Sequence, residues 1–256
     1  GGPFAPKLSY IQQMPIRYMR RHPEGSGRSR GRWVGLVASP LFIASVLFAV
    51  PIAPVASAAD CPDAEVIFAR GTDEPPGLGR VGDAFVDALR KQAAGMSIDT
   101  YAVNYKAGKL QLHGGDGAED AISHIKSTVS SCPDTKIVLG GFSQGAAVAA
   151  YTTADTVPTG FELPTGISGP MSADVAQHVA AVALFGKPSA QFVQMLDLDA
   201  PPITIGHLYA AKTIELCAPA DPVCSPPGND QSAHNSYTAN GMTDQAADFA
   251  ARAVTA

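Results

Sequence analysis

Charged side chains are scarce in this sequence. They make up 16% of its 256 residues, and aromatic residues make up only 7%. An average protein has about 25% charged residues, and a coiled coil or a disordered polyelectrolyte needs far more, so the composition excludes both. The apolar share of 46% is ordinary for a globular chain. The sequence therefore predicts a chain that folds around a buried core.

Residues 34–59 contain no charged residue, and the charges on either side differ in sign. Residues 1–33 carry seven Lys or Arg against one Glu, a net charge of +6. Residues 60–256 carry 11 basic and 22 acidic residues, a net charge of −11. An acidic body repels phosphate groups and anionic lipid, so we expect no nucleic-acid partner.

The first 59 residues have the pattern of a secretory signal peptide. A basic stretch ends at Arg32, the apolar run Trp33–Val50 follows, and the small residues Ala56–Ala59 come next. We expect a leader over residues 1–59 that is cleaved to leave Ala59 or Asp60 first. The alternative is an uncleaved anchor, because about 18 apolar residues just span a bilayer.

A cleaved leader predicts a secreted, extracellular protein, free or associated with the cell wall, with no stable membrane insertion. We expect this protein to be a monomer. The chain begins with glycine, and Met14 and Met19 are candidate translation starts upstream of the apolar run.

Only four cysteines occur, and all follow the expected cleavage site: Cys61, Cys132, Cys217 and Cys224. An even number in an oxidising compartment indicates two disulfides, for which three connectivities are possible. Pairing Cys217 with Cys224 would close a short loop and leave Cys61 for Cys132. A zinc site is the rival interpretation, but the C-x₂₋₄-C pair typical of such sites is missing.

Strand-like and helix-like segments alternate over residues 60–256. Apolar runs predict strands, and apolar residues at helical spacing predict helices. The expected strands are 65–69, 98–105, 137–139, 179–185 and 213–216, and the expected helices are 81–89, 121–129, 146–151 and 244–254. This order predicts one α/β domain over residues 60–256 with a largely parallel sheet.

One G-x-S-x-G motif has the setting that a nucleophilic serine needs. Gly141–Gly145 places Ser143 between an expected strand and an expected helix, where a sharp turn exposes the hydroxyl and aims backbone N–H groups at a developing oxyanion. A second match, Gly27–Gly31, lies in the basic leader with no strand before it, and we discard it. A tight turn without chemistry is the alternative interpretation of Ser143.

Three histidines follow Ser143 and could serve as its base. His178 and His207 precede expected strands, which puts them at the amino edge of a parallel sheet. His234 follows the last expected strand in a polar loop, at the carboxyl edge where Ser143 also lies. The position at the carboxyl edge therefore favours His234 among the three, and His234 also fits the chain order nucleophile, acid, base.

The acid that orients this histidine must lie between the two. Asp221 directly follows the last expected strand and would be held in a Cys217–Cys224 loop. Asp197, Asp199 and Asp230 remain alternatives, although each is more simply a solvated surface acid.

Five motifs in family order resemble the cutinase family, most closely its secreted actinobacterial esterases. They are Phe68–Thr72, Gly140–Gly145, Leu184–Gly186, the Cys217–Cys224 stretch with Asp221-Pro222-Val223-Cys224, and His234 with Tyr237. The resemblance implies a three-layer α/β-hydrolase with a central five-stranded parallel sheet, disulfides Cys61–Cys132 and Cys217–Cys224, and a catalytic triad of Ser143, Asp221 and His234. It also implies that Thr72 and the Gln144 backbone N–H form an oxyanion hole.

The implied activity is hydrolysis of carboxylic esters with short to medium acyl chains, cutin-like or lipid-like, without a metal or other cofactor. Alternatives are a lipase, a phospholipase or an acetyl-polysaccharide esterase on the same scaffold, and a secreted binding protein without turnover. Two stretches depart from the fungal members, an apparent insertion at 158–171 and a Pro-rich segment at 197–202. Both affect the expected substrate and leave the chemistry unchanged.

Overall fold

The computed structural model describes residues 61–108, 115–156, 170–196 and 202–256. All of them belong to one compact unit of the chain, Val55–Ala256. The expected leader lies outside the described residues, as does most of the two departing stretches. Within the described ranges, no helix combines the length and the apolar character that a membrane crossing requires.

A five-stranded sheet runs through the middle of this unit. Its strands are β1 (Ala64–Ala69), β2 (Ile98–Ala102), β3 (Lys136–Phe142), β4 (Val179–Phe185) and β5 (Thr213–Leu216). They lie in the order β2-β1-β3-β4-β5, and every neighbouring pair is parallel. The inner strands β1, β3 and β4 are buried along almost their whole length, which is why they appear as largely apolar runs in the sequence, whereas the marginal β2 and β5 carry more polar residues. The predicted five-stranded parallel sheet is confirmed.

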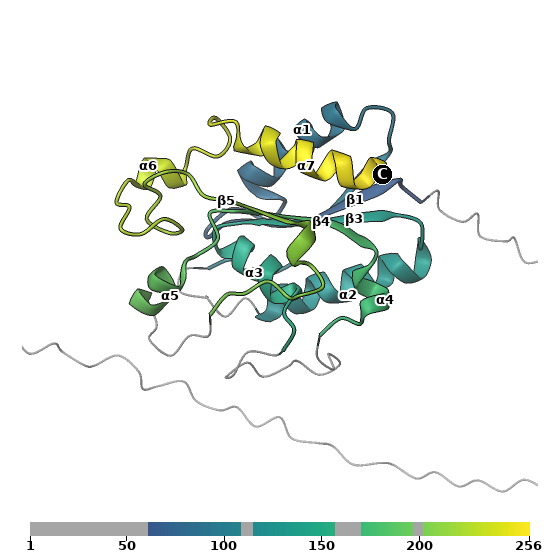
Figure 1. The fold of residues 1–256 in the computed structure, drawn as a ribbon, viewed down its shortest axis with the longest axis horizontal. Helices are drawn as coiled ribbons and strands as arrows, with labels where there is room; N and C mark the ends of the chain where they lie inside the picture. The colour runs from purple at the N-terminus through teal and green to yellow at the C-terminus, as the bar shows by residue number, and fades with distance from the viewer. Residues whose placement is uncertain (1–60, 109–114, 157–169, 197–201) are drawn as a thin grey trace, which may run out of the picture. The chain divides into compact units, whose positions relative to one another are not determined.

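Helices cover both faces of the sheet, which gives three layers (Figure 1). One face carries α1 (Gly79–Gln92) and α7 (Met242–Thr255), and the other carries α2 (Gly115–Ser131), α3 (Gln144–Thr152) and the short α4 (Ala173–Ala176). The remaining elements are the short helices α5 (Ala190–Leu196) and α6 (Gln231–His234) and the 3₁₀ turn η1 (Ala210–Lys212).

The two faces of the sheet pack differently. Under α1 and α7, the rings of Phe68, Phe85 and Phe185 form a cluster with centroids 5.7–6.2 Å apart. On the opposite face, all nine residues of the alanine-rich α3 are buried. Small side chains let this helix approach the sheet closely, and its first residue directly follows Ser143.

Two local expectations were wrong. The strand expected over residues 98–105 ends at Ala102, because Asn104 donates its backbone N–H to the Asp120 carboxylate, 2.8 Å away, and the chain leaves the sheet. The polar loop expected before the last helix contains one helical turn, α6, which ends at His234. Asp230 caps this turn by accepting the Ser232 backbone N–H.

Candidate active site

The strand order places a topological switch point at the carboxyl edge of the sheet. From β1 the chain goes outward to β2 and then returns to β3 on the other side of β1. Segments leaving β1 and β3 therefore diverge, and ligands of open parallel sheets bind at such a switch point. Thr72 lies shortly after β1, and Ser143 directly follows β3. The topology thus brings the expected nucleophile and the expected oxyanion donor to neighbouring strand ends.

Ser143 sits on a sharp turn between β3 and α3. Its backbone has φ of 55° and ψ of −119°, a conformation that non-glycine residues rarely adopt. A Cβ on Gly141 would lie 2.1 Å from the Gly145 carbonyl oxygen, and a Cβ on Gly145 would lie 2.0 Å from that of Ala69. Both glycines are therefore required for the turn to pass between its neighbours, which explains the motif in steric terms.

Ser143, His234 and Asp221 form a continuous chain of polar contacts. The Nε2 atom of His234 lies 2.9 Å from the Ser143 Oγ, and its Nδ1 atom lies 2.8 Å from the Asp221 Oδ2. Asp221 is completely buried and His234 is 7% exposed. This geometry lets the imidazole accept the serine proton while the carboxylate holds the ring in the required tautomer.

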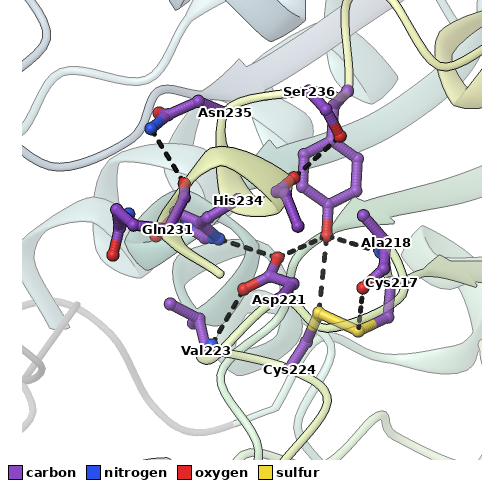
Figure 2. A network of polar contacts seen from close by, with 12 residues as sticks. Cys217, Ala218, Asp221, Val223, Cys224, Gln231, His234, Asn235 and Ser236 are labelled. Atoms are coloured by element: carbon purple, nitrogen blue, oxygen red, sulfur yellow. Dashed lines mark hydrogen bonds and ion pairs between the residues drawn. A yellow bond between two sulfur atoms is a disulfide. The ribbon is translucent and has the colours of Figure 1, made fainter. Parts of the chain in front are cut away.

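The loop that carries Asp221 is closed by the Cys217–Cys224 disulfide (Figure 2). The backbone N–H of Val223 donates to the Asp221 Oδ1 at 2.8 Å, and the Tyr237 hydroxyl donates to Oδ2 at 2.7 Å. The sulfur atoms of Cys217 and Cys224 lie close enough to Asp221 to resemble the ligands of a metal site. Since they are bonded to each other, they are not available as thiolate ligands.

The second disulfide joins Cys61 to Cys132, so the structure contains both pairs that the resemblance implies. Cys61 precedes β1 and Cys132 follows α2, and both lie away from the carboxyl edge of the sheet. This bond therefore ties the start of β1 to the end of α2 and does not hold the site.

The family model for cutinase matches residues 60–254. The chain belongs to the cutinase family. It is 51% identical over 243 residues to the probable carboxylesterase Culp3 of Mycobacterium tuberculosis, covering 93% of this chain and 84% of the relative. It is also 48% identical over 231 residues to phospholipase Culp4 of the same organism, covering 88% and 95%.

Solved structures agree with this cutinase-family fold. The catalytic core of acetyl xylan esterase from Trichoderma reesei matches with a TM-score of 0.60 and 26% identity, over 76% of this chain and all of the other. A Trichoderma reesei cutinase in complex with a phosphonate inhibitor matches with a TM-score of 0.55 and 29% identity, over 76% and 77%. Together with the relatives, these matches show that the protein is a carboxylic ester hydrolase.

The loop after β1 in this cutinase-family protein is held by a carboxylate that the sequence analysis missed. Glu74 accepts the backbone N–H of Gly71 at 2.7 Å and that of Arg80 at 2.9 Å. Arg70 reinforces the loop by donating to the carbonyl oxygens of Glu74 and Tyr105. Thr72 is exposed within this loop, and Gln144 is the buried first residue of α3. No local pattern in the sequence marks Glu74 for this role.

The alternative bases and acids that the structure describes make contacts of their own, outside the chain of Ser143, His234 and Asp221. His178 precedes β4, and its carbonyl oxygen accepts the N–H of Ile137 at the amino end of β3. His207 is exposed and pairs with Asp155, 2.6 Å away, beyond the end of α3. Asp230 is the exposed cap of α6, and the other two alternatives, Asp197 and Asp199, lie outside the described residues.

Arg80 and Phe142 also contact the histidine segment without having been predicted. The Phe142 ring stacks on the His234 imidazole with centroids 5.0 Å apart, and the Arg80 guanidinium lies 5.6 Å from the centroid of the Phe142 ring. Phe142 thus supports one face of the His234 ring.

Proposed function

We propose that this protein hydrolyses carboxylic esters through an acyl-enzyme on Ser143. His234 takes the serine proton as Oγ attacks the ester carbonyl, and Asp221 stabilises the resulting imidazolium. The imidazolium then protonates the leaving alcohol. Water repeats the sequence on the acyl-enzyme and releases the acid. The observation that carries this proposal is the unbroken contact chain from Ser143 through His234 to Asp221.

The oxyanion of each tetrahedral intermediate would be bound by Thr72 and by the backbone N–H of Gln144. Gln144 is the first residue of α3, so its backbone N–H lies at the positive end of the helix dipole, which favours a negatively charged oxygen. The Glu74 carboxylate supports the loop of Thr72 by fixing the preceding residue, Gly71. Removing one oxyanion donor typically lowers kcat by about 10²–10³-fold.

We propose short- to medium-chain acyl esters, cutin-like or lipid-like, as the substrates. The relatives include a protein named phospholipase and a structure named acetyl xylan esterase, so phospholipids and acetylated polysaccharides are the competing substrate classes. A lipase would prefer long acyl chains. A binding protein on this scaffold would show no turnover with any of them.

We also propose that residues 1–59 are a cleaved leader and that residues 60–256 form a single, monomeric, secreted domain. The basic, apolar and small-residue stretches in that order support this proposal. The mass of the N-terminal peptide of the protein recovered from the medium tests this proposal. A mature start at Ala59 or Asp60 is expected, whereas an intact residue 33–50 segment in a membrane fraction would identify an anchor.

Hydrolysis of p-nitrophenyl esters of increasing acyl length by purified residues 60–256 tests the activity. We expect turnover that is greatest at one chain length and that disappears in Ser143→Ala. A matched control is Ser236→Ala, which changes a partly buried serine of the neighbouring segment whose hydroxyl donates to a backbone carbonyl. Turnover that persists in Ser143→Ala would refute the proposed nucleophile.

A further inference from the structure

Tyr237 is the largest fully buried side chain of the described residues, and it lies three positions after His234. Its ring packs edge-on against Phe142 and Phe185, with centroids 5.6 and 6.2 Å away. A Cβ on Gly186 would lie 3.0 Å from the Tyr237 hydroxyl oxygen. The ring is therefore enclosed by the strands that end at the site, and its hydroxyl has a fixed position.

The hydroxyl of Tyr237 contacts the same carboxylate oxygen as His234. It donates to the Asp221 Oδ2 at 2.7 Å, while the His234 Nδ1 lies 2.8 Å from that atom. The phenol oxygen in turn accepts the Ala218 backbone N–H at 3.0 Å. Because a phenol has one proton and Ala218 occupies its acceptor side, that proton is directed at Asp221.

Burial, together with the hydrogen bond to Asp221, raises the pKa of Tyr237 well above its ordinary value. The phenol therefore remains a donor at every pH at which an esterase operates. The Sγ of Cys224 lies 3.4 Å from the same hydroxyl oxygen, so the disulfide of the Asp221 loop packs directly against it. Figure 2 shows this disulfide beside Ala218 and Asp221, across from His234.

We infer that Tyr237 is a positioning residue for the esterase reaction, which fixes the Asp221 carboxylate so that Oδ2 faces His234. This inference rests on the proposed function. A buried carboxylate is costly unless its oxygens are hydrogen-bonded, and here Val223 serves Oδ1 while Tyr237 and His234 share Oδ2. Without the phenol, Oδ2 would keep a single partner, and the carboxylate could rotate away from the orientation that holds the imidazole.

The phenol also affects the charge that His234 experiences. Its O–H dipole points at Oδ2 and offsets part of the negative charge there. Removing it leaves the full negative charge of Oδ2 facing the imidazole, which stabilises the positively charged form of the ring more strongly. Among the described residues, Arg80 also lies near the His234 segment, through its contacts with Phe142 and Asn235, and a substitution at Tyr237 leaves these contacts in place.

Tyr237→Phe removes the hydroxyl and keeps the ring. The test measures kcat and KM for one p-nitrophenyl ester from pH 5 to 9. The measurement is repeated for Tyr237→Phe, for Ser143→Ala and for a matched control, Tyr209→Phe. Tyr209 is also buried, but it packs on the opposite face of the sheet, and its hydroxyl has no hydrogen-bond partner among the described residues.

We expect Tyr237→Phe to lower kcat about tenfold, the effect of losing one hydrogen bond to a charged group, with KM within about twofold of the wild type. The acid limb of its kcat/KM profile should move to higher pH. Tyr209→Phe should keep the wild-type profile. A purely structural Tyr237 would lower the unfolding temperature but leave the profile unmoved, and that result would overturn the inference. Activity in Ser143→Ala would instead refute the proposed triad itself.

Discussion

Arg80 and Asn235 are 155 positions apart in the sequence, yet they join the two segments that flank Ser143. The Arg80 guanidinium donates to the Asn235 carbonyl oxygen at 3.0 Å and to its side-chain oxygen at 3.3 Å. Asn235 directly follows His234, and Arg80 is the second residue of α1, the helix after the loop of Thr72. This pair therefore connects the loop of Thr72 to the segment of His234 across the face of Phe142.

Arg80→Ala should lower kcat/KM about threefold to tenfold, because the segment that carries His234 loses two hydrogen bonds and the cation over Phe142. Steady-state kinetics with a short-chain ester measures the loss. Arg252→Ala is the matched control, since Arg252 pairs only with Asp248 on the exposed face of α7 in the described structure. Equal activity in both variants would show that the link does not support catalysis.

Gly186→Ala should lower the catalytic rate more strongly than it lowers the stability of the fold. Gly186 has φ of +57°, and an added Cβ would lie 3.2 Å from the His234 Cε1 and 3.3 Å from the Asp221 Oδ2. The strained backbone costs roughly 1–3 kcal/mol of unfolding free energy. Displacing the histidine or the aspartate should lower kcat up to about 100-fold. Denaturant unfolding and ester hydrolysis on the same sample separate the two effects. Unchanged kcat in a destabilised variant would contradict this expectation.

Removing the Cys61–Cys132 disulfide should cost more stability, and removing the Cys217–Cys224 disulfide should cost more activity. Cys61–Cys132 spans 71 residues and Cys217–Cys224 spans 7. Loop-closure entropy then predicts that replacing both cysteines by serine costs roughly 4.5 kcal/mol for the first pair and roughly 2.5 kcal/mol for the second.

Activity at 25 °C should show the reverse order, since only the second pair holds the loop of Asp221 and contacts the Tyr237 hydroxyl. Urea unfolding and kcat, measured for both double variants, give the comparison. If the Cys61–Cys132 variant lost more activity while still folded, the assignment of the shorter loop to the site would be wrong.

Glu65 should make the folded protein sensitive to acid. Burial by itself would raise the pKa of this β1 carboxyl, but hydrogen bonds from His124 and Thr128, both at 2.8 Å, lower it from its ordinary value of 4.5. A lowered pKa in the folded state stabilises the protein above about pH 4.5, and this contribution is lost as the pH falls through the folded-state value.

Denaturant unfolding at pH 7 and at pH 4 measures this contribution. Glu65→Gln should lose less stability than the wild type between the two pH values. Asp248→Asn, which changes an exposed carboxyl, should behave like the wild type. An identical pH dependence in Glu65→Gln and the wild type would exclude Glu65 as the group responsible.

Much of the fold and of the site could be predicted because the signals were local. The inner strands β1 and β3 are largely apolar, and the glycines around Ser143 are required by close backbone contacts. Chain order and the carboxyl edge then favoured Asp221 and His234, and the structure brings both to Ser143. These are properties of short segments and of parallel sheets in general.

The supporting residues could not be predicted in the same way. Glu74 binds two backbone N–H groups, and Tyr237 binds Asp221, only because their loops turn the side chains inward. No spacing in the sequence reports such a direction. The single turn α6 was missed because four residues are too few for a helical period to be recognised.

The position of β5 at the margin of the sheet has a consequence for denaturation. This strand has four residues and hydrogen-bonds to β4 alone, and the segment after it supplies Asp221 and His234, whereas Ser143 comes from the central β3. A short marginal strand detaches at a lower free energy than the centre of a sheet. In a urea titration, ester hydrolysis should therefore cease before the helical circular dichroism signal declines, so turnover serves as a sensitive reporter of whether β5 is docked.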